Sequence, residues 1–424
     1  DTLAQNLLTS GVYGHAAGVP DASFPPLYPY LLAGIYATLG RGSFQIVLLN
    51  TVFDVSTISL LAQIGKRLLP YGTSVGLLAA LFFAAYPYFA FQSLTVIDTS
   101  LFTMLLHAFI LIMIELRDRK ELDHAAWMWI GLGGVTLGLA ALDRPIVAVI
   151  GLSAFAWFVL SLGVMPTIKR LIPVAVVSVL VIIPWNVRNY AVYHTFVNIA
   201  TTTGMNFWYG NSKYTVPLLK AGYHTQWVSP DQPMNGLTPP EADRQLVDLG
   251  IRYLLDNPSQ IPELLWVKFL AYWSISIFPS KNPASGGEIN ASNPGAGHLT
   301  VNDKGEVVLA GMSPSDPVTA YATPLFDQIG RVVHIIYFGS LLLLALIGLI
   351  RVRSAWRNVS FIWFIQISMT IIYVLFIPTT RYRVPTDSLL FLFSAWTLIS
   401  LWVHYRKREF PAIRLFMPSH HDST

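Results

Sequence analysis

Long apolar runs recur along the chain and form its strongest pattern. Nine of them are long enough to cross a bilayer, which takes about 20 apolar residues in a helix. Strands of a membrane barrel would instead be about ten residues long and alternate in polarity. The pattern therefore predicts an all-α polytopic membrane protein, with spans at residues 44–65, 72–91, 97–116, 126–142, 145–162, 171–186, 327–350, 358–377 and 386–404.

Two regions outside these runs divide the chain. Residues 1–43 are expected to form a first external loop with juxtamembrane helices, and residues 187–325 a large external loop. Transmembrane helices then occupy residues 44–186 and 326–408, followed by a cytoplasmic tail at 409–424. A loop as long as 187–325 is uncommon as a plain connector, and long loops of this kind usually carry function.

Basic residues predict the orientation. They follow the first, third, fifth, seventh and ninth runs, so they fall on one side if each run crosses the membrane once. Short loops rich in Lys and Arg stay cytoplasmic. The chain is therefore expected to begin outside and end inside, from clusters at Lys66 and Arg67, at Arg117, Arg119 and Lys120, at Lys169 and Arg170, at Arg351, Arg353 and Arg357, and at Arg406, Lys407 and Arg408.

Helix signals also occur in the external regions. Residues 3–9 are expected to form a helix ended by Gly11, and the proline-broken apolar stretch 25–39 to lie along the membrane or re-enter it. The motif Thr-Pro-Pro-Glu at 238–241 is typical of a capping box with proline in the first turn. It predicts a helix that continues to about residue 256.

The end of the large loop contains a second apolar stretch, residues 261–278. Its aromatic residues suit the headgroup zone, and Glu263 and Lys268 favour an interfacial helix over a span. The segment 279–300 is rich in Gly, Asn, Ser and Pro and is expected to be mobile.

Composition supports the membrane class and adds little else. The chain has 424 residues, of which 54% are hydrophobic and 12% are charged; soluble domains usually carry about 25% charged residues. The net charge of +4 is accounted for largely by the cytoplasmic clusters, so it does not indicate nucleic acid as a partner. The chain has no cysteine, so no disulfide contributes to stability.

Four arginines break the orientation rule. Arg144, Arg188, Arg381 and Arg383 each lie at the end of an apolar run that the topology assigns to the outside. Guanidinium groups match the geometry of phosphate with paired hydrogen bonds, so the cluster favours an anionic ligand at the outer face. Two plainer interpretations stay open: snorkelling to lipid headgroups, and an interfacial ion pair between Arg144 and the preceding Asp143.

Amides and aromatic residues accompany two of these arginines. Asn189 follows Arg188, and Asn206, Trp208 and Asn211 lie in the glycine- and aromatic-rich stretch beyond it. Aromatic faces cover the apolar surfaces of sugars and amides bond their hydroxyls, which makes these residues candidates for sugar or acceptor binding. The alternative is an aromatic membrane belt with a turn. Tyr382 lies between Arg381 and Arg383 and is a candidate for the phosphate site.

Acidic residues near the outer face are the remaining candidates. Asp98 begins the third span, where it could cap the helix or face a polar cavity. Asp54 lies within a span and must face protein or water. His15 and Asp21 are possible cavity residues of the first loop. We find neither metal-ligand spacing nor a glycine-rich phosphate loop, so no metal or cofactor is expected.

In this order and topology the motifs resemble the GT-C superfamily of membrane glycosyltransferases, specifically prokaryotic members of glycosyltransferase family 39, which includes protein O-mannosyltransferases and aminoarabinose transferases. The resemblance covers nearly the whole chain. It rests on Leu3–Gly11, Phe24–Pro29, Asp143-Arg144-Pro145, Pro184–Tyr190, Gly204–Asn211 and Arg381–Pro385.

The resemblance implies a GT-C-type bundle of about nine transmembrane helices in the bacterial cytoplasmic membrane, with its catalytic face outside. Such enzymes move a sugar from a polyprenyl-phosphate donor to a protein, lipid or glycan acceptor, and membrane lipids are further partners. It also implies that Arg188, Arg381 and Arg383, with Tyr382 and Arg144, bind the lipid phosphate. No metal is required.

The chain departs from the family pattern at its first loop. The family's catalytic acid generally lies several residues before the Leu-Ala pair that corresponds to Leu3-Ala4, where this chain has only Asp1 and Thr2. We therefore expect that acid and a first transmembrane helix upstream of Asp1, and take Asp98 as the candidate catalytic carboxylate of this chain.

Two other functions stay open: a transporter or flippase for a lipid-linked or anionic substrate, and a polymerase or ligase of surface polysaccharide. The glycosyltransferase hypothesis makes one geometric prediction. Asp98, Arg188, Arg381 and Arg383 should line a single outward-opening cavity.

Overall fold

The fold is helical apart from one short hairpin. A computed structural model describes residues 1–232, 234, 236–281, 299–302, 304–309 and 325–409. Strands β1 (Leu299–Val301) and β2 (Val307–Leu309), which the sequence analysis did not predict, pair antiparallel. Most of the stretch that we expected to be mobile, and all but the first residue of the predicted cytoplasmic tail, lie outside the described residues.

Eight helices in the described part of the chain are long and apolar enough to cross a membrane. They are α3 (Ser43–Leu68), α6 (Thr99–Asp118), α7 (His124–Asp143), α8 (Ala148–Leu162, with the 3-10 turn Pro145–Val147 before it), α9 (Val164–Tyr193), α14 (Leu325–Arg351), α15 (Trp356–Leu375) and α16 (Thr380–Glu409). The second expected span is a bent pair, α4 (Gly72–Ala84) and α5 (Pro87–Ser93), with an angle of 60° between its parts. Proline at the start of α5 explains the break, because it removes a helical donor and disfavours the helical conformation before it.

Small residues let two of these helices approach closely. Gly134 and Gly138 of α7 are four residues apart and face α9. A Cβ at Gly134 would lie 2.5 Å from the Cβ of Val177, and one at Gly138 would lie 2.7 Å from the Cβ of Val181. This small-xxx-small spacing is a common basis of helix packing in membranes, where the hydrophobic effect does not drive helices together.

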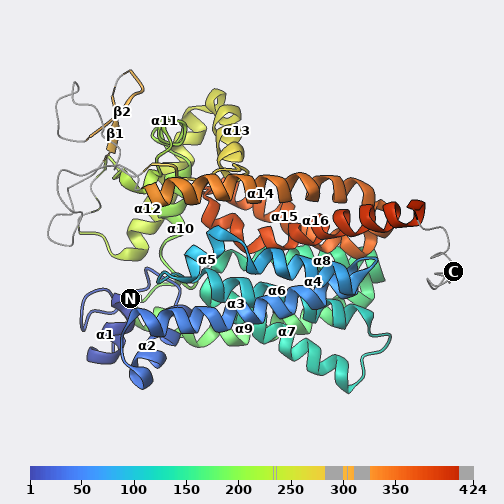
Figure 1. Cartoon of the computed structure of the whole chain (residues 1–424). Helices are drawn as coiled ribbons and strands as arrows, with labels where there is room; N and C mark the ends of the chain where they lie inside the picture. The colour runs from blue at the N-terminus through green and yellow to red at the C-terminus, as the bar shows by residue number, and fades with distance from the viewer. Residues whose placement is uncertain (233, 235, 282–298, 303, 310–324, 410–424) are drawn as a thin grey trace.

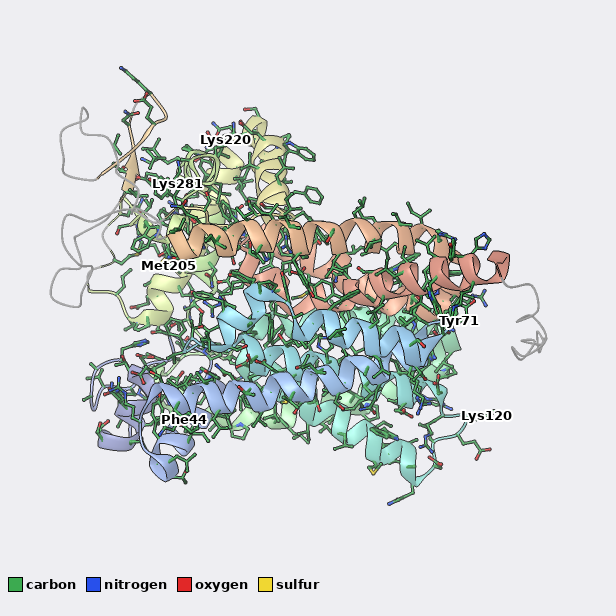
Figure 2. The ribbon with its side chains drawn as sticks, viewed as in Figure 1. Phe44, Tyr71, Lys120, Met205, Lys220 and Lys281 are labelled. Carbon is green, nitrogen blue, oxygen red and sulfur yellow. The ribbon has the colours of Figure 1, made fainter. Side chains whose placement is uncertain are left out.

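The external elements gather at one end of the bundle. Figure 1 shows α1, α2 and α10 to α13 around the end where the N-terminus lies, while α16 ends at the opposite end. In Figure 2, Lys120 and Tyr71 mark that opposite end, and Phe44 and Met205 lie at the external one. The arrangement agrees with the sidedness predicted from the basic clusters, and the protein is a multi-pass membrane protein.

The short external helices follow their sequence signals closely. Helix α1 (Thr2–Ser10) ends at Gly11, whose φ of 68° is left-handed. Helix α12 (Pro239–Asp256) begins with the predicted capping box, in which the backbone N–H of Thr238 donates to Glu241 Oε2 at 2.8 Å. Helix α2 (Leu27–Leu39) is apolar but shorter than a span. Two further helices, α10 (Thr203–Gly210) and α11 (Thr215–Ala221), complete the large loop.

Among the boundaries that differ from the prediction, two concern the large loop. Helix α9 continues to Tyr193, so Arg188 and Asn189 belong to a helix end rather than to the loop. Helix α13 (Ile261–Tyr272) ends six residues before the predicted interfacial helix would. Its Lys268 is fully buried, which contradicts a headgroup-facing position.

Lys268 is buried because it joins α13 to the ends of two other helices. Its Nζ donates to the carbonyl of Gly210 at 2.9 Å, to Asn211 Oδ1 at 3.1 Å and to the carbonyl of Leu375 at 3.2 Å. The ammonium therefore binds the C-terminal ends of α10 and α15, where carbonyls lack helical partners. Burial lowers the pKa of Lys268 to about 7.

Candidate functional site

A pocket of about 320 Å³ lies between the first external region and the outer ends of three membrane helices. Part of the lining belongs to α1, α2 and the loop between them. The rest belongs to the segment before α6, the end of α7 and the start of α16. The lining residues are Asp1, Thr2, Leu3, His15, Phe24, Pro25, Tyr28, Pro29, Leu32, Val96, Ile97, Asp98, Asp143 and Arg381. This volume is at the lower end of the range for small-molecule sites.

An ion cluster centred on Asp98 forms the polar end of this pocket. Arg144 donates from Nε to Asp98 Oδ2 at 2.6 Å and from Nη2 to Oδ1 at 3.0 Å. Arg381 donates from Nη2 to the same Oδ1 at 2.7 Å. Two guanidinium groups from different helices therefore share one carboxylate, and the cluster has a net charge of +1.

The electrostatics keep Asp98 ionised. Burial by itself would raise the pKa of this carboxyl, but the two arginines outweigh it and hold the pKa well below its usual range. A carboxylate held this way is a poor proton acceptor. Its role is instead to hold the guanidinium groups of Arg144 and Arg381 next to each other.

The two arginines differ in access. The side chain of Arg144 is 8% exposed, whereas that of Arg381 is 39% exposed and lines the pocket. Among the described residues, no hydrogen-bond partner is found for Arg381 Nε. Arg381 is therefore the arginine that a ligand in the pocket can reach, and Arg144 mainly supports Asp98.

The structure distinguishes between the interpretations that the sequence left open for Asp98 and for Arg144. Asp98 occupies the N-cap position of α6, but its side chain makes no capping bond and instead faces the pocket. Arg144 does not pair with its neighbour Asp143, as the interfacial interpretation assumed. It pairs with Asp98, 46 residues earlier in the chain.

A polar stripe on α3 holds the segment that carries Asp98. Asn50 is fully buried and donates from Nδ2 to the carbonyls of Ser93 at 3.0 Å and Thr95 at 3.1 Å. Its Oδ1 accepts a bond from the hydroxyl of Tyr28, a pocket residue, at 3.2 Å. Asn50 thus links α2, α3 and the break between α5 and α6.

Sequence reasoning missed Asn50, although a signal was present. Asn50, Asp54 and Thr57 are spaced i, i+4 and i+7 in an apolar helix, which places them on one face. Asp54, which we expected to face protein or water, accepts a bond from Ser93 Oγ at 2.6 Å.

Arg188 lies at the first external loop and not in the pocket lining. It donates from Nη1 to the carbonyl of Asp21 at 2.6 Å and from Nη2 to the carbonyl of Tyr13 at 2.9 Å. Its guanidinium also packs over Trp185, 4.8 Å from the ring centroid. The arginine therefore fixes both ends of the loop between Tyr13 and Asp21 to the end of α9.

Arg383 is fully buried at the base of the external helix α13. Its Nε donates to Asp387 Oδ1 at 3.0 Å, and its Nη1 donates to the carbonyls of Tyr272 at 2.8 Å and Ser274 at 2.7 Å. The predicted common cavity is therefore correct for Asp98 and Arg381 and wrong for Arg188 and Arg383.

The predicted sugar-binding residues lie outside the pocket lining as well. Asn189 is buried and donates to the carbonyl of Ile199 at 3.1 Å. Asn211 is buried and joins the end of α10 to that of α15 by donating to the carbonyl of Leu375 at 2.9 Å. Trp208 packs inside the external region, and Asn206 is half-buried on α10.

Tyr382 and Asp1 also lie at the site. Tyr382 stacks on Tyr373 with parallel rings 4.8 Å apart, next to Arg381. Asp1, which we did not expect to be the catalytic acid, lines the pocket and pairs with Arg41 at 2.5 Å.

Comparisons with known proteins agree with this architecture. Residues 23–187 match the model of the family described as dolichyl-phosphate-mannose-protein mannosyltransferase. No curated protein sequence matches the chain significantly.

Three solved structures match the chain at low sequence identity. The oligosaccharyltransferase of Archaeoglobus fulgidus, tethered to an acceptor peptide, has a TM-score of 0.50 and 12% identity over 91% of this chain and 42% of that chain. Archaeal oligosaccharyltransferase AglB from the same organism, with an inhibitory peptide and a dolichol-phosphate, has a TM-score of 0.49 and 13% identity over 95% and 44%. ArnT from Cupriavidus metallidurans, bound to undecaprenyl phosphate, has a TM-score of 0.40 and 12% identity over 99% and 75%.

The match to the Archaeoglobus fulgidus oligosaccharyltransferase shows a shared fold, although this chain spans less than half the length of that protein. The helical membrane bundle predicted from the sequence is confirmed by the structure. The family match contains Asp98 and Arg144, two of the three members of the ion cluster. Residues 23–187, less than half of the chain, are therefore similar to the dolichyl-phosphate-mannose-protein mannosyltransferase family.

Proposed function

We propose that the protein transfers a sugar from a polyprenyl-phosphate donor to an acceptor at the outer face of a bacterial cytoplasmic membrane. The observation that carries this proposal is the arginine pair on Asp98 at the end of the pocket, in a chain whose residues 23–187 match the mannosyltransferase family model. Its net positive charge lies at the outer end of the membrane helices, where the phosphate of a lipid donor would be.

Arg381 is the proposed phosphate ligand. It is the more exposed of the two arginines and lines the pocket. When the bond between the sugar C1 and the phosphate oxygen breaks, negative charge develops on the departing lipid phosphate. A fixed guanidinium at that place stabilises this charge more than the ground state, which lowers the barrier.

Asp98 is proposed to act through the arginines and not as a base. Its carboxylate is engaged on both oxygens by Arg144 and Arg381, so it has little capacity to take a proton. Arg188 and Arg383 are proposed to position the first loop and helix α13, since their donors are used on backbone carbonyls.

The test is transfer of labelled mannose from undecaprenyl-phosphate mannose, with the protein in membranes. The wild type should release undecaprenyl phosphate and give a labelled product, and the variant Arg381→Gln should not. Arg244→Gln is a matched control, because Arg244 is an exposed arginine of α12 outside the pocket lining. Movement of the intact donor across the membrane, with no labelled product, would support a transporter or flippase and overturn the proposal.

A further inference from the structure

His15 and Asp21 form a hydrogen-bonded pair in the wall of the pocket. The ring Nδ1 of His15 lies 2.7 Å from Asp21 Oδ2, and His15 itself lines the pocket. The histidine side chain is 47% exposed, and the aspartate side chain is 15% exposed. The carboxylate is thus shielded behind an accessible ring.

Three donors fix the carboxylate. Asp21 Oδ2 accepts the backbone N–H of His15 at 2.8 Å as well as the ring contact, and Oδ1 accepts the backbone N–H of Ser23 at 3.0 Å. Burial alone would raise the pKa of Asp21, but these hydrogen bonds outweigh it and the pKa is lowered. An ionised Asp21 can only accept, so the ring nitrogen that faces it carries the proton.

The loop that holds the pair is closed tightly. The backbone N–H of Asp21 donates to the carbonyl of Tyr13 at 2.9 Å, and Arg188 binds both carbonyls at this closure. Gly14 is needed inside the loop, because a Cβ there would lie 1.8 Å from the carbonyl oxygen of Val19. The ring of His15 also packs on Phe24, with centroids 5.4 Å apart.

A carboxylate behind Nδ1–H determines which histidine tautomer is present. The other nitrogen, Nε2, is then left with a lone pair that can accept a hydroxyl hydrogen. Catalytic histidines are oriented by the same logic. Here the accessible ring is part of the pocket whose lining also includes Arg381.

We propose that His15, oriented by Asp21, is a hydroxyl-binding residue of this pocket. The inference rests on the proposed function, because the hydroxyl belongs either to the sugar of the lipid-phosphate donor or to the acceptor. Arg381 then binds the phosphate, and Nε2 of His15 accepts a hydroxyl hydrogen bond in the same pocket. Asp21 is a positioning residue that acts through His15.

The experiment compares two ligands with the protein in nanodiscs: undecaprenyl phosphate, which has no sugar, and undecaprenyl-phosphate mannose. It also measures transfer of labelled mannose in membranes. The variants are His15→Ala and Asp21→Asn. His124→Gln is the matched control, since His124 is exposed at the start of α7, at the opposite end of that helix from the pocket.

Two results would support the inference, and they distinguish a hydroxyl of the donor sugar from a hydroxyl of the acceptor. If the hydroxyl belongs to the donor sugar, His15→Ala weakens binding of the mannose donor about tenfold, as expected for one hydrogen bond, and leaves undecaprenyl phosphate binding unchanged. If it belongs to the acceptor, both affinities stay unchanged and transfer falls at saturating donor. Asp21→Asn should change the same quantity in the same direction by a smaller factor.

Other results overturn it. Equal weakening of both ligands by His15→Ala would mean that the residue acts on the phosphate or on the fold, and unchanged binding and transfer would mean that it binds nothing. A wild type that binds neither ligand would overturn the proposed function and this inference together. A wild type that binds both and transfers mannose, with His15→Ala equal to it, overturns this inference alone.

Discussion

Arg144, at the end of α7, donates two hydrogen bonds to Asp98, at the start of α6, with distances of 2.6 and 3.0 Å. This two-bond geometry is the strongest arrangement that a guanidinium and a carboxylate form. It connects the outer ends of two adjacent membrane helices and holds Asp98 in position for Arg381. The site therefore depends on a pair whose members the sequence places far apart.

Removal of one partner of this pair should be more damaging than removal of both. Arg144→Gln leaves Asp98 with Arg381 alone, and loss of one partner of a buried pair costs about 3–5 kcal/mol. In the double variant Asp98→Asn, Arg144→Gln the charge left without its partner is that of Arg381, which is 39% exposed, so the two effects should be less than additive. Thermal unfolding in detergent checks this, and strictly additive shifts would contradict a direct coupling.

Substitution of Arg381 should mainly reduce phosphate binding, whereas substitution of Arg383 should mainly reduce stability. Arg381→Gln should weaken binding of undecaprenyl phosphate by about 10–100-fold, the value of a charge-assisted hydrogen bond, with little loss of stability because the side chain is 39% exposed. Arg383→Gln leaves Asp387 buried beside Tyr86 without its cation and should lower stability by about 3–5 kcal/mol. Affinity and thermal unfolding, measured on both variants, check the contrast. Equal loss of phosphate affinity in a stable Arg383→Gln protein would show that both arginines form the phosphate site.

Asn50 should act as a positioning residue for Asp98. Asn50→Asp keeps the size but replaces the amide donor that binds the carbonyls of Ser93 and Thr95 with an acceptor. We expect transfer to fall about tenfold or more through kcat. In an Asp98→Asn background the change should have little further effect, because both act on the same segment. Ser56→Ala is the control on the exposed face of α3, and full additivity with Asp98→Asn would indicate a general loss of stability instead.

Lys268 should make the stability of the external region depend on pH. Burial lowers its pKa to about 7, from an ordinary value of 10.5. Between these two values the unfolded chain binds more protons than the folded protein, so stability contributed by this group rises with pH from about 7 to about 10.5. The apparent Tm of the wild type should increase over this window.

The variant Lys268→Met should lose that increase while also losing the hydrogen bonds to the ends of α10 and α15. Lys220→Met is the control, because Lys220 is exposed and pairs with Glu263 on the surface. A pH profile that is the same in wild type and Lys268→Met would contradict the assignment.

Much of the fold could be predicted because hydropathy is a local property. An apolar run long enough to cross a bilayer must close its own backbone hydrogen bonds, so each of the nine runs identifies a helix without knowledge of its neighbours. The capping box at Thr238 and the glycine stop at Gly11 are equally local. The bend of 60° between α4 and α5 follows from Pro87, but its angle depends on packing against other helices.

The sequence by itself determined the membrane class, predicted the sidedness and identified the cluster of arginines that breaks the orientation rule. Only the tertiary structure decided which arginine faces the pocket. Arg381 and Arg383 are two residues apart on α16, and about 200° of helix rotation separates them, so one meets Asp98 and the other the buried Asp387. The contact between Asp98 and Arg381 joins positions 283 residues apart. No local pattern encodes such a pairing, because it arises from how the helices pack together.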